Sequence, residues 1–440
     1  MQPIKIDLLI NSRWIIPVLP ENRVFENCAL AIDQQKIVGI YPQAEAQSKF
    51  DAASVVDLAD HILMPGLVNA HGHAAMSLLR GYADDLPLKP WLEEHIWPVE
   101  ARVLSEEFVA DGTNLAMAEM IKTGTTCFAD MYFFADTVAE QVQRSGMRSQ
   151  IGFTVFDFPT AGGKDPDDYI HKGLQLRDSY KGDGLIKIAC APHAPYTVGD
   201  ETLRRIATYA NELDMPVHIH CHETAQEVAD SLKLFGNRPL QRLDDLGVLL
   251  PQTQLVHMTQ IDDSDIHLIQ DNNCDVVHCP ESNLKLASGF CPVGKLIDAG
   301  INVAIGTDGA ASNNDLDLFG ELKTAALLAK AVANDASVLD AHAALRMATI
   351  NGAKALGWDD QIGSLETGKS ADVIAVEISS LSQKPLYNPA SQLVYSNAGS
   401  QVTHSWVAGK ALLRERSLVT LDEDNLIRRA DAWRNQIRPS

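Results

Sequence analysis

Between residues 63 and 367, short apolar runs alternate with longer amphipathic stretches, and this alternation constrains the fold more than any other feature of the chain. The apolar runs include CFADMYF, RSQIGFTVF, IKIACAPHA, PVHIHCHE, TQLVHMT, DVVHCPES and NVAIGTDGA. Strand, helix, strand units repeated over about 300 residues favour a parallel sheet that closes into a barrel. We therefore predict an α/β fold whose main domain is a (β/α)₈ TIM barrel.

Both ends of the chain follow a different pattern. Residues 1–62 hold short β-rich pieces separated by Pro, Gly and Asn, and a similar pattern returns after residue 367 in VTHSWVAGKALL. A last segment, EDNLIRRADAWRNQIRP, has the apolar spacing of an amphipathic surface or docking helix. We predict that residues 1–62 and 368–440 form a small β-sandwich domain with a terminal helix, and that residues 63–367 form the barrel.

Composition excludes several classes of partner. The chain has 440 residues and a net charge of −22, which disfavours binding to nucleic acid or to an anionic membrane surface. No apolar run reaches the roughly 20 residues of a membrane-spanning helix. The seven cysteines lack CxxC spacing and the N-terminus lacks the pattern of a signal peptide. We expect a cytoplasmic protein that acts on a small molecule.

Imidazole and carboxylate side chains gather at the ends of the predicted barrel strands. Because the carboxyl ends of barrel strands converge on one mouth, these side chains are expected to lie close together. Two histidines separated by one residue point to the same face of a strand, which suits a shared metal ion. The residues at these strand ends are His71, His73, His193, His218, His220, His222, His257 and Asp308.

Three imidazoles and one carboxylate, without cysteine, suit Zn²⁺, with Fe²⁺ or Mn²⁺ as alternatives. A site of this kind keeps a position for water and lowers the pKa of that water towards about 7, which favours hydrolysis or hydrolytic deamination. Spacing alone does not choose among His218, His220 and His222, since all three share one face of the predicted strand.

Five segments carry a family resemblance that covers nearly the whole chain: MPGLVNAHGH, HIHCHET, LVH, HCPESNLKLASG and GTDGAASNNDLDLFGELK. In this order they resemble the metal-dependent amidohydrolase superfamily. Within it, the chain is most similar to the 5′-methylthioadenosine and S-adenosylhomocysteine deaminases. The resemblance implies deamination of an adenosine derivative, such as 5′-methylthioadenosine, S-adenosylhomocysteine or 5′-deoxyadenosine, to the inosine derivative and ammonia. Guanine deaminase and s-triazine amino- or chlorohydrolase are the alternatives, because barrel and metal do not select the leaving group.

The resemblance implies that His71, His73, His220 and Asp308 are the metal ligands. It also implies that Glu223, His257 and Asp308 are catalytic. Loss of an aromatic amine requires protonation of the ring nitrogen beside the attacked carbon, a role that falls to Glu223. Asp308 and His257 are expected to orient water and to move its protons.

We expect one metal ion per subunit. Binuclear members of the superfamily bridge two ions with a carboxylated lysine at the end of strand four. The lysine in that predicted strand is Lys187, six residues before His193 and therefore roughly 20 Å down the strand. Since homologous barrels commonly associate, we also expect a homo-oligomer.

The resemblance further implies contacts to a nucleoside. In PWLEEHIWPVE, Trp91 and Glu100 match a pair that embraces the nucleoside, with Glu100 accepting hydrogen bonds from the ribose hydroxyls. His193 and Ser312 match residues that contact nitrogens of the base. The alternative is that Trp91 packs a lid helix and that Glu100 is exposed.

Arg148 matches an arginine that faces the amino-acid carboxylate in members that accept S-adenosylhomocysteine. Those members use a second arginine about a dozen residues later, where this chain reads FDFPTAGGKD. We therefore expect a preference for 5′-methylthioadenosine or another 5′-modified adenosine over S-adenosylhomocysteine. The alternative is that Arg148 is a surface charge at a helix end.

Overall fold

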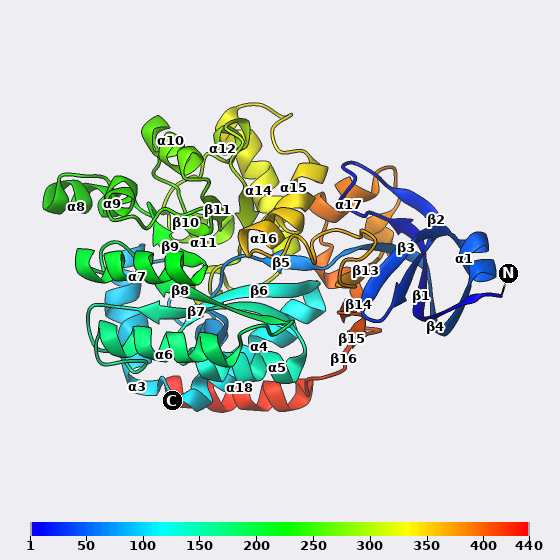
Figure 1. The fold of residues 1–440 in the computed structure, drawn as a ribbon, viewed down its shortest axis with the longest axis horizontal. Coiled ribbons are helices and arrows are strands. Elements are labelled where there is room, and N and C mark those ends of the chain that lie inside the picture. Colours follow the sequence, from blue (N-terminus) through cyan, green and yellow to red (C-terminus); the bar gives the residue numbers. More distant parts are fainter. Residues whose placement is uncertain (1, 439–440) are drawn as a thin grey trace.

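The computed structural model describes residues 2–438, and its largest element is a barrel of eight parallel strands (Figure 1). The strands follow one another around the barrel in sequence order, and each pairs with its neighbour in parallel. This confirms the predicted barrel. The strands are β5 (Leu67–Asn69), β6 (Thr125–Tyr132), β7 (Arg148–Val155), β8 (Ile186–Pro192), β9 (Val217–Cys221), β10 (Thr253–His257), β11 (Asp275–His278) and β12 (Val303–Ile305).

Backbone hydrogen bonds just beyond β5 and β12 join the first and last strands of the barrel. Ala70 N–H donates to the Ile305 carbonyl at 2.9 Å, and Asp308 N–H donates to the His71 carbonyl at 3.1 Å. Glycine is needed between them, because a Cβ at Gly306 would lie 2.7 Å from the His71 nitrogen. The closure therefore places the segments after β5 and β12 in direct contact.

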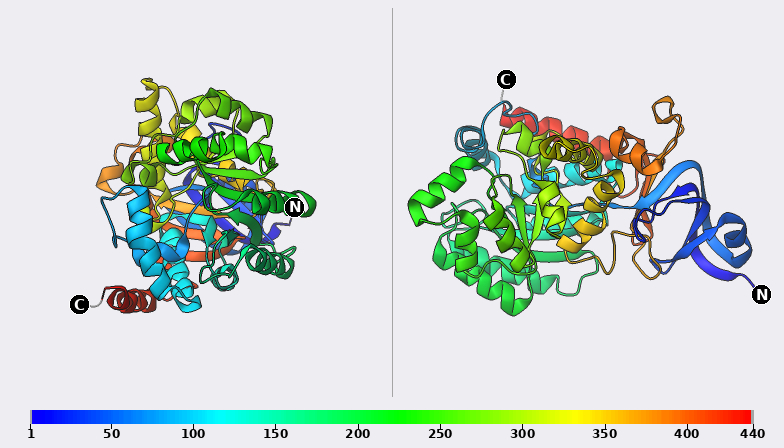
Figure 2. Two further views of the ribbon diagram at one scale, coloured as in Figure 1. Left: turned by 90° about the vertical axis from the view of Figure 1, so that its left-hand side faces the viewer. Right: turned by 90° about the horizontal axis from the view of Figure 1, so that it is seen from above.

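Helices cover the outside of the barrel (Figures 1 and 2). The first long one, α4 (Glu106–Thr123), begins where Ser105 accepts a hydrogen bond from Phe108 N–H and ends at Gly124, whose φ is 98°. The others are α5 (Ala135–Ser145), α6 (Pro166–Ser179), α7 (Asp200–Leu213), α8 (Ala225–Phe235), α9 (Pro239–Asp245), α10 (Asp263–Asp271), α11 (Pro280–Lys285), α12 (Val293–Asp298), α13 (Ala310–Asn313), α14 (Leu318–Ala333), α15 (Ala341–Met347) and α16 (Ile350–Ala355).

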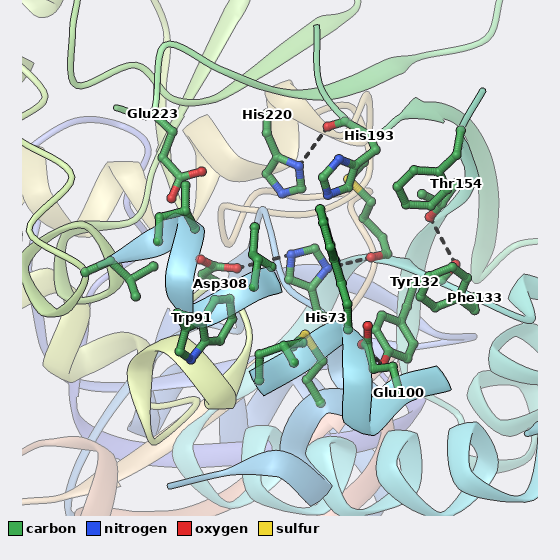
Figure 3. A pocket seen from close by; sticks show the side chains of 18 of the residues that line it. His73, Trp91, Glu100, Tyr132, Phe133, Thr154, His193, His220, Glu223 and Asp308 are labelled. Carbon is green, nitrogen blue, oxygen red and sulfur yellow. Dashed lines mark hydrogen bonds and ion pairs between the residues drawn. The ribbon is translucent and has the colours of Figure 1, made fainter. Parts of the chain in front are cut away.

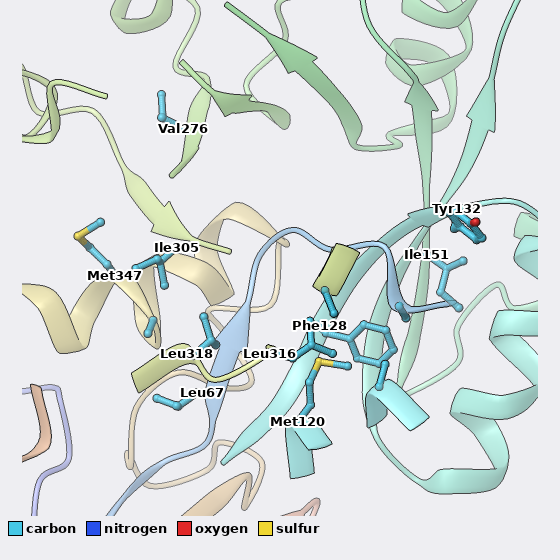
Figure 4. Packing of buried hydrophobic residues seen from close by; sticks show 14 of the residues in the cluster. Leu67, Met120, Phe128, Tyr132, Ile151, Val276, Ile305, Leu316, Leu318 and Met347 are labelled. Carbon is cyan, nitrogen blue, oxygen red and sulfur yellow. The ribbon is translucent and has the colours of Figure 1, made fainter. Parts of the chain in front are cut away.

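One continuous apolar core lies between the strands and these helices. Figure 4 shows Phe128 of β6 beside Met120 of α4, and Ile305 of β12 beside Met347 of α15. All eight residues of β6 are buried, as expected for a parallel strand with both faces covered. A strand that is covered on both faces is apolar at nearly every position. The barrel strands could therefore be predicted from continuous apolar runs, without an alternation of apolar and polar residues.

Between β5 and α4, a helical segment lies at the mouth of the barrel. It consists of the short 3₁₀ helix η1 (Ala74–Leu79), α2 (Leu88–Pro90), the π-helical turn η2 (Trp91–Ile96) and α3 (Trp97–Val103). We call residues 74–103 the lid segment.

The second domain is an eight-stranded sheet that draws on both ends of the chain, as predicted. Its strand order is β16-β15-β14-β13-β4-β1-β2-β3. Its elements are β1 (Ile4–Ile15), β2 (Phe25–Asp33), β3 (Lys36–Pro42), α1 (Gln43–Lys49), β4 (Phe50–Pro65), β13 (Val373–Glu377), β14 (Val402–Val407), β15 (Lys410–Arg414) and β16 (Ser417–Leu418).

A core of its own holds this sheet domain together. Ile10, Leu30, Leu63, Val373 and Trp406 lie in one buried cluster, so strands from both chain ends share apolar contacts. Strand β13 pairs antiparallel with β4 and joins the two ends directly. These strand bounds support the division into residues 1–62, 63–367 and 368–440, which we retain as a proposal.

The predicted terminal helix is α18 (Glu423–Ile437), and it docks on the barrel of its own chain (Figure 2). The Trp433 indole packs edge-on against Phe108, with ring centroids 5.3 Å apart, and its N–H donates to Asp111 at 2.7 Å. Arg102 of α3 donates to the carbonyl of Ile437 at 3.0 Å, so this helix also contacts the lid segment. Within residues 2–438, every helix is too short or too polar to cross a membrane.

The placement of Arg148 corrects both predictions made for it. Arg148 is the first residue of β7, so it lies at the end of the barrel opposite the mouth, and only 2% of it is exposed. Its guanidinium donates to both oxygens of Asp372, at 2.9 and 3.3 Å, and stacks on Trp358 at 4.3 Å. It is neither a substrate contact nor a surface charge, because it pairs the barrel with the sheet domain.

Breaking this buried ion pair is expected to destabilise the fold. Arg148→Met leaves the Asp372 carboxylate buried without its cation, so we expect the free energy of unfolding to fall by about 3–5 kcal/mol. Arg144→Met is the matched control, because Arg144 pairs with Glu140 on the exposed side of a helix and should cost less than about 0.5 kcal/mol. Urea unfolding of the two variants measures the difference, and equal midpoints would contradict the assigned role.

Candidate active site

His71 and His73 lie beyond the end of β5, in an extended segment between the neighbouring strands. Strand β5 ends at Asn69, so the two histidines are not on the strand itself. The Gly72 carbonyl accepts from Met131 N–H of β6 at 3.0 Å, and the segment is joined to β12 on its other side as described above. Hydrogen bonds to both neighbours therefore direct these two side chains, where strand alternation alone was expected to do so.

Four imidazoles and one carboxylate converge at the mouth, and Figure 3 shows His73, His220 and Asp308 among them. Oδ1 of Asp308 lies 3.4 Å from Nε2 of His71 and 3.2 Å from Nε2 of His73. Nε2 of His220 lies 3.3 Å from Nε2 of His71. Two overlapping groups able to hold a metal ion share His71: one with His73 and Asp308, the other with His220 and His257.

The second ring nitrogen of each imidazole is held by a hydrogen bond. Nδ1 of His73 donates to the Met131 carbonyl at 2.5 Å, and Nδ1 of His220 donates to the His193 carbonyl at 2.8 Å. Nδ1 of His257 lies 2.9 Å from the amide oxygen of Asn283. A carbonyl oxygen only accepts, so these rings carry their proton on Nδ1 and turn a free Nε2 lone pair towards the cluster. The donor set and its orientation fit a divalent metal ion bound through nitrogen and oxygen.

The structure separates the three histidines that spacing left equivalent. His220 points into the cluster. His218 lies one layer below it, with Nε2 2.7 Å from Nδ1 of His71. His222 follows the end of β9 in the left-handed region, with φ of 53°, and its ring contacts the Gln260 carbonyl and Leu240 N–H behind the site. The change of backbone conformation after Cys221 therefore turns His222 away from its two neighbours.

Glu223 lines the pocket beside His257. Its Oε2 lies 3.7 Å from Nε2 of His257, and its Oε1 is 3.5 Å from the Ser288 hydroxyl. Burial raises the pKa of the Glu223 carboxyl, which favours the protonated form needed by a proton donor. Glu227 holds the local backbone, since its two oxygens accept from the N–H groups of His222 and Glu223 at 2.9 and 2.7 Å.

Asp308 is oriented by hydroxyl groups behind it. Its φ is 61°, and its Oδ2 accepts from Ser282 at 2.6 Å and from Ser312 at 3.0 Å. The predicted contact of Ser312 with the base of the substrate stays a prediction. The Ser312 side chain lies outside the pocket lining and is occupied by Asp308 and by the Gly309 carbonyl.

A pocket of about 660 Å³ opens beside the cluster, and Trp91, Glu100 and His193 line it as predicted (Figure 3). Glu100 is only 7% exposed and accepts a hydrogen bond from the Tyr132 hydroxyl, so the alternative of an exposed Glu100 is wrong. Burial raises the pKa of Glu100 to about 7. The Trp91 N–H is buried and has no protein partner within hydrogen-bond distance.

Several pocket residues were not predicted. Tyr132, Phe133, Phe156 and Tyr196 form an aromatic wall, and Phe156 stacks on the His193 ring with centroids 4.8 Å apart. Burial lowers the pKa of His193 to about 3, so its ring is neutral. The sequence does carry a sign of this wall, because aromatic residues stand at or shortly after the ends of β6, β7 and β8, in DMYFF, VFDF and PHAPY. Within the described residues 2–438, the lining of this pocket contains no lysine or arginine.

The chain is similar in sequence and in structure to known proteins. Residues 62–412 match the model of the amidohydrolase family. A 5-methylthioadenosine/S-adenosylhomocysteine deaminase from Teredinibacter turnerae is 54% identical over 98% of both chains. The crystal structure of an adenosine deaminase from Xanthomonas campestris with bound zinc has a TM-score of 0.98 and 52% identity over 100% of both chains. An atrazine chlorohydrolase from Arthrobacter aurescens shares the fold alone, with a TM-score of 0.90 at 24% identity over 97% of this chain and 99% of that one.

Metal binding should distinguish two histidines of the same segment. We expect His220→Ala to bind less than about a tenth of the metal held by the parent protein, because it removes a ligand atom. His222→Gln should keep full metal content, since its ring faces away from the cluster. Metal per chain, measured by atomic emission after dialysis, provides the check, and metal loss in His222→Gln alone would reverse the assignment.

Proposed function

The chain belongs to the amidohydrolase family, and on this premise we propose that it is a metal-dependent deaminase of adenosine derivatives. The observation that carries the proposal is the convergence of Glu223, His257 and Asp308 on one pocket, next to the imidazole cluster. These groups are an acid, a base and a set of metal donors within reach of one bound molecule. The same set would be superfluous at a purely structural metal site, which is normally closed by four protein ligands.

The residues assigned to hold the ion are His71, His73, His220 and Asp308, and the ion that we assign is one Zn²⁺ per chain. Support comes from the neutral imidazole donors and from the zinc bound in the Xanthomonas campestris enzyme. Fe²⁺ and Mn²⁺ satisfy the same donor types. When bound, such an ion acts as a Lewis acid and lowers the pKa of a water molecule towards neutrality.

A second ion of the carboxylated-lysine type does not fit the barrel. Lys187 donates to the Gly357 carbonyl and lies 5.1 Å from the Trp358 ring. Trp358 also stacks on Arg148, so Lys187 is at the end of the barrel remote from the cluster. This placement supports the assignment of a single ion.

Proton donation to the substrate ring is assigned to Glu223. Attack on the amine-bearing carbon of a purine pushes charge onto the adjacent ring nitrogen, so a positioned acid is needed there. The buried Glu223 carboxyl lines the pocket and is held by Glu227 through the local backbone. Because burial raises its pKa, a larger share of this carboxyl is protonated near neutral pH than in an exposed glutamate.

Proton removal from water and proton delivery to the leaving amine are assigned to Asp308 and His257. Asp308 keeps Oδ1 towards the cluster while Ser282 and Ser312 bind Oδ2. His257 turns Nε2 towards Glu223 and the pocket. A base that takes a proton from water becomes an acid, and it can return that proton to the leaving amino group, which departs as ammonia.

Recognition of ribose is assigned to Glu100 and Trp91. Tyr132 donates to Oε1 of Glu100, which leaves Oε2 to accept from a hydroxyl group of the ligand. The Trp91 ring lines the same pocket. A ribose diol supplies hydroxyl donors for the Glu100 carboxylate, whereas a triazine or guanine offers no diol. We therefore favour a nucleoside over these two alternatives.

The 5′ substituent is assigned as uncharged. The lid side of the pocket carries Leu88, Leu92 and Ile96, and Arg148 lies at the opposite end of the barrel. An amino-acid carboxylate at this wall would lose its hydration without gaining a cation, which is unfavourable. This supports 5′-methylthioadenosine or 5′-deoxyadenosine over S-adenosylhomocysteine.

The remaining expectations are part of the same proposal. A net charge of −22 supports free nucleosides as substrates over nucleic acid. Seven free, buried cysteines support a reducing location such as the cytoplasm. Association into a homo-oligomer stays a prediction.

Removing the acid should separate chemistry from metal binding. We expect Glu223→Gln to lower kcat by about 10²–10⁴-fold while metal content and fold are retained, because the amide keeps the shape but cannot release a proton. Glu94→Gln is the control, because Glu94 is an exposed glutamate of η2 that does not line the pocket. Ammonia release under saturating substrate measures kcat, and unchanged turnover in Glu223→Gln would refute its role.

Substrate preference should follow the 5′ group. We expect kcat/KM for 5′-methylthioadenosine to exceed that for S-adenosylhomocysteine by about tenfold or more, equal to about 1.4 kcal/mol or more of transition-state binding. The panel also includes adenosine, 5′-deoxyadenosine, guanine and chlorotriazines, with ammonia or chloride release as readout. Activity confined to guanine or triazines would overturn the nucleoside proposal and leave the metal site in place.

A further inference from the structure

A buried row of polar side chains runs from the metal cluster down the interior of the barrel. Nδ1 of His71 lies 2.7 Å from Nε2 of His218, and Nδ1 of His218 lies 2.5 Å from Oε1 of Gln254. Gln254 in turn donates to the Ala355 carbonyl at 2.7 Å and exchanges hydrogen bonds with Gln150 at 2.8 and 3.1 Å. His71 and Gln254 are fully buried, and His218 and Gln150 are at most 2% exposed.

His71 differs from the other cluster histidines in the group that orients it. His73 and His220 each donate to a backbone carbonyl, which can only accept. The partner of His71 is another imidazole, and a neutral imidazole either donates or accepts at Nε2. If His218 carried its proton on Nε2, His71 would have to accept at Nδ1 and would carry its own proton on Nε2. That proton would occupy the lone pair needed by a metal ion.

The far end of the row removes this ambiguity. The Ala355 carbonyl needs a donor, so the NH₂ group of Gln254 must face it and the amide oxygen must face His218. Because that oxygen only accepts, His218 must carry its proton on Nδ1. Nε2 of His218 then accepts from Nδ1 of His71, and Nε2 of His71 is left unprotonated.

We infer that His218 and Gln254 are positioning residues that set the tautomer of His71. The Ala355 carbonyl orients the Gln254 amide, Gln254 fixes the proton of His218, and His218 fixes the proton of His71. This inference rests on the proposed metal site, and it adds a role for two residues that touch neither metal nor substrate. Along the path from His71 through His218 and Gln254 to Ala355, each group donates to the next one, so a single set of proton positions satisfies all three hydrogen bonds. Outer partners of this kind commonly change metal affinity by about 10–100-fold.

Zinc affinity tests the role of His218 without any substrate. Zn²⁺ is titrated against a chromophoric chelator, and the thermal midpoint of the metal-free protein reports the fold. We expect His218→Leu to bind Zn²⁺ about 10–100-fold more weakly, because His71 loses its acceptor. His218→Gln should recover most of the affinity, since its amide oxygen can reach the position of Nε2 and accept from His71.

Gln150→Leu is the matched control within the same row. It removes a buried polar side chain of the same layer, but the Ala355 carbonyl still orients Gln254, so we expect affinity within about threefold of the parent protein. Equal weakening in Gln150→Leu and His218→Leu would indicate a general loss of core packing and would overturn the inference. Parent-like affinity in folded His218→Leu would do the same.

Neutron diffraction from deuterium-exchanged crystals of the parent protein tests the tautomers directly. We expect deuterium on Nδ1 of both His71 and His218 and none on Nε2 of His218. Deuterium on Nε2 of His218 would overturn the tautomer assignment alone. A parent protein that binds no divalent metal would instead overturn the proposed function, and the two failures are therefore distinguishable.

Discussion

The closure of the barrel between β5 and β12 is the constraint on which the whole site depends. Ala70 and Asp308 donate backbone hydrogen bonds across this seam, and Gly306 allows the chains to approach. His71 and Asp308 follow the first and the last strand of the barrel and are 237 positions apart in the sequence, yet they are joined through their own backbones. The metal cluster is assembled where the sheet closes, so a barrel that failed to close would lose the site as well as the fold.

The same backbone groups that end the strands also orient the imidazoles. Met131 is the penultimate residue of β6, and its carbonyl accepts from His73. His193 directly follows β8, and its carbonyl accepts from His220. The partner of His71 at Nδ1 is the His218 side chain, so side chains in the barrel interior orient this third imidazole. A polar row in an otherwise apolar interior costs desolvation free energy, and full hydrogen bonding offsets that cost.

Much of this arrangement was predictable from the sequence, because strands and their polar ends leave a strong pattern. The barrel, the sheet domain shared by both chain ends and the pocket positions of Glu100 and His193 followed from that pattern or from the family resemblance. Arg148 was misplaced because its role was taken from the family resemblance, although it stands at the start of the run RSQIGFTVF and therefore at the strand end away from the mouth. His222 could not be separated from His220, since the change to φ of 53° after Cys221 depends on tertiary contacts. The tautomer row needs contacts between residues more than 100 positions apart, as between Gln150 and Gln254, and a single sequence does not reveal these.

The buried ion pair of Arg148 and the candidate site lie at opposite ends of the barrel. Segments near the C-terminus of the chain contact both ends. At the end opposite the mouth, Arg148 and Asp372 join the sheet domain to β7 through a buried ion pair with two hydrogen bonds. At the mouth, α18 holds the end of the lid segment through Arg102, only two residues from Glu100. Within the lid segment, Glu100 accepts a hydrogen bond from Tyr132 of β6, so the same stretch of α3 is joined both to the barrel and to the last helix. The proposed ribose contact of Glu100 therefore lies close to the docking site of the last helix, although no residue of that helix lines the pocket in the described part of the chain.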